Sequence, residues 1–360
     1  MPFYSQTAIH QSYTWICQKR THHSPNSDIW HLRNNWADIR KQIIHQLSTQ
    51  TYQLSPVIYY HIKGELIGVW SSKDAIVLKM LASYLSNSLS QVLSPEVFHL
   101  SSTASRKRGI PAAIDRLKKK LPNYAFIMRS DVKGYYASID HQIILQQCRK
   151  YIDNPLILNL IKQYLQYTIY DEGIYRTNQQ GLSLGCPLSP IMGALYLLPL
   201  DQAMAKRDVF YIRYMDDWII LATSRWKLRR AVKQCNQILN QLKVLKHPDK
   251  TYIGKVTKGF DFLGVQIDVV VENLFCSKTK GIMAKSNQDP ITIKAKKVLT
   301  SPSKPSIIKY FQKISRLYEQ GASKERIQAY RKRWVSYKLQ LCNSLILGHA
   351  TFYRLCPVGN

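Results

Sequence analysis

Two neighbouring acidic residues, Asp216 and Asp217, lie between two apolar runs in the segment YIRYMDDWIIL. Both runs have the composition of β-strands, so the pattern predicts a tight hairpin over Phe210–Leu221 with Met215, Asp216 and Asp217 at its tip. Adjacent carboxylates repel each other unless a cation offsets their charge, and carboxylate oxygens are ligands that divalent ions such as Mg²⁺ prefer. The alternative is a solvated turn without chemistry, because Asp is a frequent turn residue.

A third carboxylate, Asp131, directly follows the apolar run Tyr124–Met128, which predicts a short buried strand. Two tyrosines and a helix near Asp140–Tyr151 come next. If this strand end lies beside the hairpin tip, the three carboxylates could hold two metal ions about 3.5–4 Å apart. Such a pair of ions can activate an attacking hydroxyl and stabilise a leaving pyrophosphate, and these two segments could supply the oxygen ligands that this chemistry needs.

The order and content of these segments resemble the palm of reverse transcriptases. Five boxes are similar to those of that family and follow in its order across residues 131–264: Asp131–Tyr136 (DVKGYY), Gly181–Pro190 (GLSLGCPLSP), Tyr214–Asp217 (YMDD), Lys250-Thr251, and Gly259–Gly264 (GFDFLG), the counterpart of the primer grip. Arg213 before the third box and His141 after the first are similar to the bacterial branch, which includes group II intron-like and free-standing enzymes. The resemblance implies an α+β, right-hand polymerase fold with fingers, a palm with an antiparallel sheet, and a helical thumb.

The resemblance also implies roles for the acidic residues. Asp131, Asp216 and Asp217 would be catalytic, and their carboxylates, with the carbonyl of Val132, would hold two Mg²⁺ ions, for which Mn²⁺ could substitute. For Asp217 an alternative stays open, in which it orients the hairpin without touching metal.

Further positions would bind the incoming nucleotide. Tyr136 would exclude a 2′-hydroxyl by steric clash and so favour dNTPs, although one of Tyr135 and Tyr136 is expected to be a packing residue. Gly185 would let the template or incoming base approach the backbone, and Lys250 would lie near the phosphates unless it is merely a solvated turn lysine.

The chain departs from the family where Ser183-Leu184 replaces a Pro-Gln pair. Leu184 lacks the amide that would contact the nucleotide, so substrate handling is expected to differ. No clear fingers arginine is present for the triphosphate, and Lys63 and Lys73 are the candidates.

The chain has 51 Lys and Arg against 22 Asp and Glu among 360 residues, a net charge of +29, which favours a polyanionic partner. No basic helix with a clean apolar face is evident, so an anionic membrane is the weaker partner. Nucleic-acid contacts are expected from basic side chains and, by the resemblance, from four residues of the palm. For each basic side chain the alternative is that it is simply solvated on the protein surface. These residues are Arg106, Lys107, Arg108, Lys118, Lys119, Lys120, Arg326, Arg331, Lys332, Arg333 and Lys338, with Tyr214, Phe262, Leu263 and Gly264.

The expected domain order is an N-terminal extension (1–53), fingers (54–125), palm (126–145), fingers (146–184), palm with the catalytic hairpin and primer grip (185–275) and a basic helical thumb (276–360). Residues 1–27 are polar and expected to be irregular. Two strands are expected within 56–70 and strand-like structure over Tyr252–Val270. Helices are expected over Ile29–Leu47, Asp74–Leu93, Pro111–Leu121, Leu188–Lys206, Lys227–Leu242, Ser306–Glu319 and Lys324–Leu341.

The seven cysteines form no C-x-x-C pair and no apolar run reaches the roughly 18 residues of a membrane span, so a reduced, cytoplasmic protein without a membrane partner is expected. The best-supported function is an RNA-directed DNA polymerase with an RNA template, a DNA or RNA primer and dNTPs; a dedicated non-coding RNA is a further candidate partner. The alternatives are a non-catalytic, maturase-like RNA-binding protein and an RNA-dependent RNA polymerase, which Tyr136 disfavours. The sequence leaves open whether the protein serves a mobile element, phage defence or a CRISPR-linked system.

Overall fold

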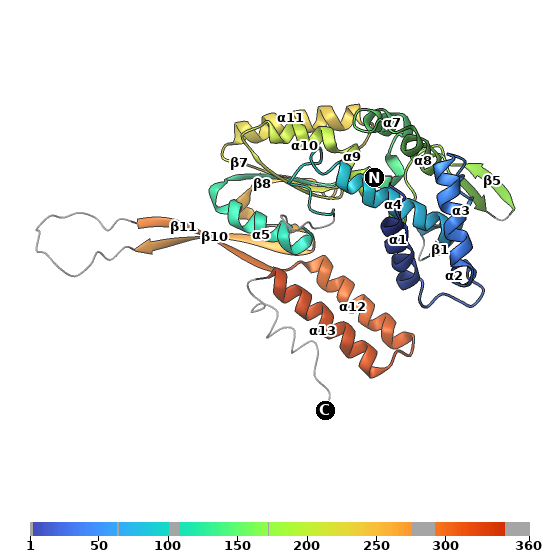
Figure 1. Cartoon of the computed structure of the whole chain (residues 1–360). Coiled ribbons are helices and arrows are strands. Elements are labelled where there is room, and N and C mark those ends of the chain that lie inside the picture. Colours follow the sequence, from blue (N-terminus) through green and yellow to red (C-terminus); the bar gives the residue numbers. More distant parts are fainter. Residues whose placement is uncertain (1–2, 63–64, 101–107, 172, 276–291, 343–360) are drawn as a thin grey trace, which may run out of the picture.

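The computed structural model describes residues 3–62, 65–100, 108–171, 173–275 and 292–342. Helices and three β-sheets follow one another along this chain, which confirms the α+β class (Figure 1). Among the described residues, no helix is both long and apolar enough to cross a membrane.

The central sheet has the strand order β6-β7-β3-β8 and is antiparallel throughout. Its strands are β3 (Phe126–Ser130), β6 (Phe210–Tyr214), β7 (Asp217–Ala222) and β8 (Tyr252–Lys255). Alternate residues of a strand face opposite sides, so Ile220 of β7 joins one core and Ile219 the other. Helices α10 (Leu198–Ala205) and α11 (Arg225–Gln241) cover the first face, and α5 (Ile110–Lys120) lies across the second (Figure 1).

A second sheet, with the order β2-β1-β4-β5, lies at the other end of the molecule. It contains one parallel pair, β1 with β4, and lies at the edge of the molecule with helices beside it (Figure 1). Its strands are β1 (Val57–Ile62), β2 (Glu65–Val69), β4 (Thr168–Asp171) and β5 (Ile174–Thr177), and the nearby helices are α1 (Gln6–Lys19), α2 (Asp28–Asn34), α3 (Trp36–Ser48), α4 (Ser72–Ser88), α7 (His141–Arg149) and α8 (Pro155–Leu165).

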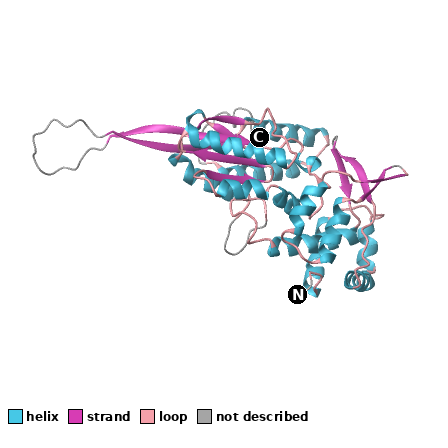
Figure 2. Ribbon diagram, turned by 90° about the horizontal axis from the view of Figure 1, so that it is seen from above, coloured by secondary structure: helices cyan, strands magenta, loops and turns pink. Residues whose placement is uncertain are grey.

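The third sheet is a long hairpin that extends away from the body, as Figure 2 shows from above. It is formed by β9 (Phe260–Phe262), β10 (Val265–Phe275) and β11 (Thr292–Pro302). Two helices with a small core of their own follow, α12 (Lys304–Glu319) and α13 (Lys324–Leu341). The remaining elements are η1 (Leu121–Asn123), α6 (Tyr135–Ser138), α9 (Ser189–Tyr196) and η2 (Val256–Lys258).

Most expected elements are present, but four expectations are wrong. Residues 6–19 form α1, capped by Ser5, where irregular chain was expected. The single helices expected over Ile29–Leu47 and Leu188–Lys206 are each two helices, divided at Asn35 and Leu197. Part of the tail expected to be helical is strand β11, which pairs with β10 along its whole length.

Gly181 fits where no other residue does, at the point where the loop before α9 passes the α6 turn. Its φ is +81°, and a Cβ there would lie 2.9 Å from the Cα and carbonyl oxygen of Ala137 and from the carbonyl oxygen of Tyr136. Leu182 N donates to that same Tyr136 carbonyl at 2.8 Å, so the loop holds the backbone of Tyr136 in place.

We therefore expect Gly181→Ala to lower the free energy of unfolding by about 1–3 kcal/mol or more, since it adds a backbone clash to an unfavourable φ. Gly321→Ala is the matched control, because φ there is +64° but nothing lies within 4 Å of the added methyl group. Chemical denaturation of both variants measures the difference. Equal losses would show that the close approach to α6 does not matter.

Candidate active site

The three acidic residues singled out in the sequence come together at one end of the central sheet. β3 pairs with β7 so that Ser130 lies opposite Trp218, which places Asp131 beside Asp217. Tyr214 pairs with Asp217, so Met215 and Asp216 form the turn of the β6–β7 hairpin. Asp131 and Asp217 line a cavity of about 480 Å³, which confirms the predicted convergence of strand end and hairpin tip.

Asp131 is 7% exposed, and its two carboxylate oxygens differ in their surroundings. Oδ2 accepts a hydrogen bond from Lys250 Nζ at 2.6 Å, whereas Oδ1 is buried without a hydrogen-bond partner. The chain before Lys250 is held here because His247 N donates to the Asp131 carbonyl at 2.9 Å. Lys250 is therefore not a purely solvated turn lysine.

Asp217 lies beside Arg129, whose Nε is 3.9 Å from Asp217 Oδ1. That oxygen is buried and has no hydrogen-bond partner, since Arg129 directs its hydrogen bond to Asp261. Burial raises the pKa of Asp217 to about 7, the Arg129 guanidinium opposes the rise, and the neighbouring carboxylates of Asp131 and Asp216 add to it. Burial and the charge of Asp131 also raise the pKa of Asp216.

These carboxylates fit a hard divalent cation. Among the described residues, no three His, Cys, Asp or Glu side chains are already grouped as a metal site. The fit depends instead on donor chemistry, because Asp131 and Asp217 each keep a buried oxygen without a partner. Burial, with the charge of nearby carboxylates, raises the pKa values of Asp216 and Asp217. Val132 lies opposite Lys246, but the two hydrogen bonds to this segment are made by its neighbours. His247 N donates to the Asp131 carbonyl, and Lys133 N donates to the Leu245 carbonyl.

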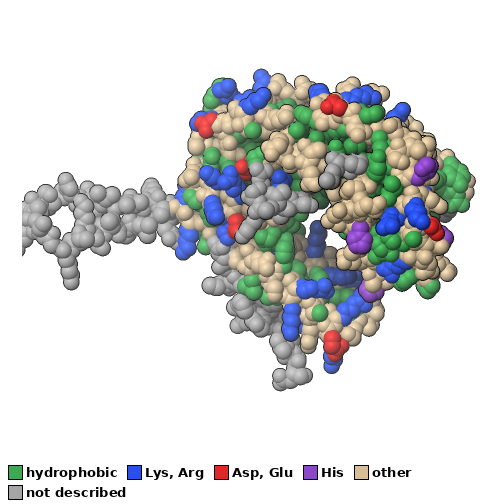
Figure 3. All heavy atoms as spheres, viewed as in Figure 1, with side chains coloured by type: hydrophobic (Ala, Val, Ile, Leu, Met, Phe, Trp, Pro, Cys, Tyr) green, Lys and Arg blue, Asp and Glu red, His purple; other side chains and the backbone are tan. Residues whose placement is uncertain are grey.

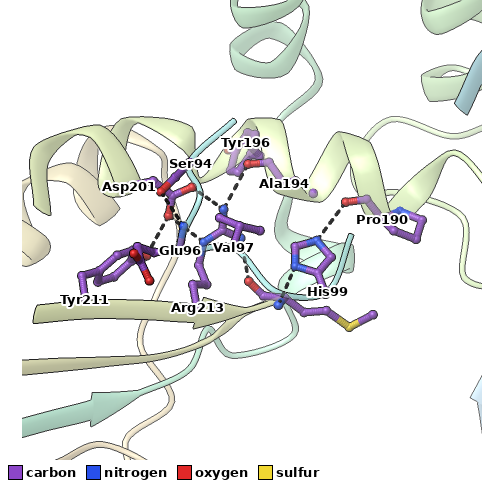
Figure 4. Close-up of polar contacts among 12 residues, drawn as sticks. Ser94, Glu96, Val97, His99, Pro190, Ala194, Tyr196, Asp201, Tyr211 and Arg213 are labelled. Atoms are coloured by element: carbon purple, nitrogen blue, oxygen red, sulfur yellow. Dashed lines mark hydrogen bonds and ion pairs between the residues drawn. The ribbon is translucent and has the colours of Figure 1, made fainter. Parts of the chain in front are cut away.

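The hairpin turn is held to the helices that cover the sheet by a fully buried ion pair between Arg213 and Asp201 (Figure 4). Arg213 donates to both oxygens of Asp201, at 2.8 and 2.5 Å, and to the carbonyl of Ala194 in α9. It also donates to the carbonyl of Met215 at 2.7 Å, and Met215 has a φ of +56°. Asp201 raises the pKa of Arg213 against the effect of burial, so the guanidinium is charged.

His99 holds the other side of the same turn. Met215 N donates to His99 Nδ1 at 2.9 Å, and His99 Nε2 lies 3.2 Å from the carbonyl of Pro190 (Figure 4). Since Nδ1 must accept, the ring is neutral with its proton on Nε2. Burial, together with the Arg213 charge, lowers the pKa of His99 to about 3.

The two tyrosines of the first box divide as expected. Tyr135 is buried and donates to the Gly193 carbonyl at 2.5 Å, so it is the packing residue. Tyr136 is half-buried, and burial together with the charge of Asp216 raises its pKa to about 12, which places it near the hairpin turn. A Cβ on Gly193 would lie 3.1 Å from the Tyr136 ring, so a small residue is needed there.

The other expected nucleotide-binding residues lie elsewhere. Gly185 (φ +85°) lines a separate cavity of about 250 Å³, and Leu184 is exposed. Ser183, which replaces the family's proline, is buried and accepts a hydrogen bond from Trp70 Nε1 at 3.0 Å. Lys73 donates to Gln46 of α3 and does not line the carboxylate cavity; Lys63 lies outside the described residues.

The residues expected to contact nucleic acid lie in different surroundings, and their roles stay predictions. Phe262 is fully buried and Lys338 is 4% exposed, so neither side chain presents a surface to nucleic acid here; Leu263 and Gly264 line the carboxylate cavity. Arg108 donates to the carbonyl of Val97. Lys119 and Arg333 are exposed, Lys118 and Arg331 are half-buried, Tyr214 packs at 6.0 Å edge-on to His99, and Arg106 and Lys107 lie outside the described residues.

Sequence reasoning missed the residues that position the site: His99, Arg129, Asp201 and Asp261. Asp261 stands inside one of the recognised boxes and Arg129 two positions before another, which could have drawn attention to them. His99 and Asp201 lie in no motif, and their partners become neighbours only in the fold.

Comparison with known proteins gives a consistent result. A family model described as "Reverse transcriptase (RNA-dependent DNA polymerase)" matches residues 68–267, which is more than half of the chain. The chain is 23% identical over 208 residues to Protein YkfC of Escherichia coli (strain K12), covering 46% of this chain and 55% of YkfC. It is 22% identical over 219 residues to Group II intron-encoded protein LtrA of Lactococcus lactis subsp. cremoris, covering 59% of this chain and 35% of LtrA. The chain thus matches about half the length of the first relative and about a third of the second.

The raised pKa of Asp217 predicts a pH-dependent gain in stability for Asp217→Asn. An unfolded Asp has a pKa near 3.9, so the folded protein binds more protons between about pH 4 and pH 7, and this group makes wild-type stability fall as pH rises through that range. The melting temperature of Asp217→Asn should therefore exceed that of the wild type by an amount that grows from pH 4 to pH 7. Asp249→Asn, at an exposed position in the same cavity, should parallel the wild type. A difference that does not change with pH would contradict the assignment.

For His99 the change of stability with pH has the opposite sign. An unfolded His has a pKa near 6.5 and the folded group about 3, so its contribution to stability is complete above pH 6.5 and is lost as pH falls toward 3. His99→Asn keeps an acceptor for Met215 N but cannot titrate, so it should become more stable relative to the wild type as pH falls. His99→Ala should in addition lose about 1–3 kcal/mol at every pH for the unpaired amide. Thermal melts from pH 4.5 to 8 measure both effects, and parallel wild-type and Asn curves would rule out the neutral ring.

Proposed function

Because the chain belongs to the reverse transcriptase family, we propose that it is an RNA-directed DNA polymerase which extends a primer 3′-hydroxyl with dNTPs on an RNA template. The primer would be DNA or RNA. The observation that carries the proposal is the convergence of Asp131, Asp216 and Asp217 at one end of the sheet, with buried carboxylate oxygens that lack a partner.

The three carboxylates, with the Val132 carbonyl, would hold Mg²⁺. When bound, the ions would activate the attacking hydroxyl and stabilise the leaving pyrophosphate. Lys250, whose ammonium group pairs with Asp131 in this structure, would contact the phosphates of the nucleotide. Arg129 and His99 would act on the reaction only through the carboxylates and the turn that they hold.

Tyr136 would select the sugar. It lies near Asp216, and the Gly181 loop fixes its backbone, so its ring is supported in one place. A rigid ring against C2′ of the incoming nucleotide would clash with a ribose hydroxyl and admit deoxyribose. The same feature disfavours an RNA-dependent RNA polymerase.

The domain assignment is part of this proposal. The central sheet with α9, α10 and α11 would be the palm, the second sheet and its helices the fingers, and α12 with α13 the thumb. The proposed thumb is tied to the palm, because Lys338 Nζ donates to the carbonyl of Gly264 at 2.8 Å and Ser303 N donates to the same oxygen. A primer held by Leu263 and Gly264 would therefore lie where palm and thumb meet.

A non-catalytic RNA-binding protein is the second candidate. The observation that favours it is the ion pair of Lys250 with Asp131, which already neutralises one carboxylate.

Primer extension on poly(rA)/oligo(dT) with Mg²⁺ and dTTP or rUTP tests the proposal. Asp131→Asn and Asp216→Asn should reduce dTTP incorporation at least ~10³-fold, which corresponds to the several kcal/mol that a metal-held transition state gains. Asp249→Asn, a carboxylate of the same cavity without a proposed role, should stay within threefold. Tyr136→Ala should raise the use of rUTP relative to dTTP. An inactive wild type that still binds the primed RNA tightly would refute the polymerase and leave the RNA-binding protein.

A further inference from the structure

A second groove lies between α11 and the edge strand β8, away from the carboxylates. It encloses about 790 Å³ and shares no lining residue with the carboxylate cavity. Phe126, at the first position of β3, forms part of its floor, whereas Asp131 follows the last position of that strand. Phe126 and Asp131 are five positions apart, or roughly 17 Å along an extended strand, so the groove is a different surface from the proposed active site.

The rim of this groove is entirely cationic. Among its lining residues five are basic and none is acidic, and all five are exposed: Arg225, Arg229, Lys233, Lys255 and Lys258. None of them forms an ion pair with a carboxylate of the described chain. The neighbouring Lys227, by contrast, is paired with Asp208. In Figure 3 the Lys and Arg side chains gather along the upper edge of the molecule, over α11.

The basic residues form two rows. Arg225, Arg229 and Lys233 are spaced by four positions on α11, which puts them on one face about 6 Å apart. Lys255 and Lys258 belong to the other wall, at the end of β8 and in η2. Between the rows the floor is apolar, with Phe126, Leu228, Val232 and Ile253.

Two apolar side chains are exposed to solvent, one in the floor of the groove and one on α11 beside the residues that line it. Ile253 in the floor is 51% exposed, and Trp226 is 66% exposed. Trp226 stands three positions before Arg229 and is therefore its neighbour on the helix. An exposed indole beside a row of unpaired cations is the combination with which proteins hold single-stranded nucleic acid, through stacked bases and tracked phosphates.

We propose that this groove binds a single-stranded segment of an RNA that stays bound while the carboxylate cavity holds primer and template. A single strand offers a phosphate at every nucleotide and open base faces for the floor and the indole, whereas the bases of a duplex are stacked inside and cannot use an apolar floor. A peptide would need acidic residues on both sides of an apolar face to match the same rims.

The groove also corrects an expectation from the sequence, since α11 is a basic amphipathic helix. Its apolar face is not available to a membrane, because Ala231, Cys235 and Leu239 are buried against the sheet. Only the charged flank of α11 and Trp226 remain exposed to solvent. This favours binding of a polyanion in solution over insertion into lipid.

The test uses the full chain, with its primer–template site filled by an unlabelled RNA–DNA hairpin whose primer end is blocked. Binding of a fluorescein-labelled 12-nucleotide oligo(U) is then measured by anisotropy at several KCl concentrations. The groove variant is Arg229→Gln/Lys233→Gln. The matched control, Lys206→Gln/Arg230→Gln, removes the same charge from the neighbouring surface outside the groove.

We expect the wild type and the control to bind oligo(U) within threefold of each other with the hairpin present. The groove variant should bind at least tenfold more weakly, and the slope of log K against log salt should fall by about 1.4, for two lost phosphate contacts at about 0.7 each. Trp226→Ala should weaken binding by about tenfold without changing the slope.

Complete displacement of oligo(U) by the hairpin, or equal losses in the groove and control variants, would overturn the proposal. So would tighter, groove-dependent binding of a labelled 12-residue peptide of alternating Asp and Leu, which would assign the groove to a protein partner. No step requires catalysis, so an inactive polymerase would leave this result unchanged.

Discussion

The buried ion pair between Arg213 and Asp201 is the interaction on which the geometry of the proposed active site depends. Both side chains are fully buried, and the guanidinium is shared among Asp201, the carbonyl of Ala194 and the carbonyl of Met215. A buried charge without its partner typically costs about 3–5 kcal/mol, so strand, helices and turn are held in a single arrangement. The turn keeps Met215 at a positive φ, and in this conformation Asp216 and Asp217 face the end of β3.

This arrangement concentrates negative charge at one place in a strongly positive protein. Three carboxylates stand together, and burial raises the pKa of two of them. Lys250 and Arg129 offset part of this negative charge. Asp131 and Asp217, beside which they lie, each keep one oxygen without a hydrogen-bond partner. Two cations therefore balance the negative charge of the site only in part. If the carboxylates hold Mg²⁺ as proposed, the arrangement that would bind the ions costs stability without them, as expected where function requires a locally unfavourable arrangement.

How much of this follows from the sequence depends on how local each signal is. The β6–β7 hairpin, β3 and the helices of the tail were predictable, because continuous apolar runs or helical spacing lie within each segment. The break at Asn35 and the pairing of β11 with β10 were not, since they depend on one residue's backbone and on a partner strand. His99 could not be recognised either, because its contacts to Met215 and Pro190 cross 116 and 91 residues.

The basic residues show the same limit of prediction from sequence. The sequence assigns basic residues of the tail and of the 106–108 loop to nucleic acid alike, yet Lys338 is buried on the Gly264 carbonyl and Arg108 donates to Val97. Conversely, the cations on α11 carried no motif, and only the fold shows that they are exposed, unpaired and aligned along an apolar floor. A net charge predicts the kind of partner. Which cations meet it is decided by burial and by competing acceptors within the protein, so a surface for polyanions has to be identified from pairing and not from the count of basic residues.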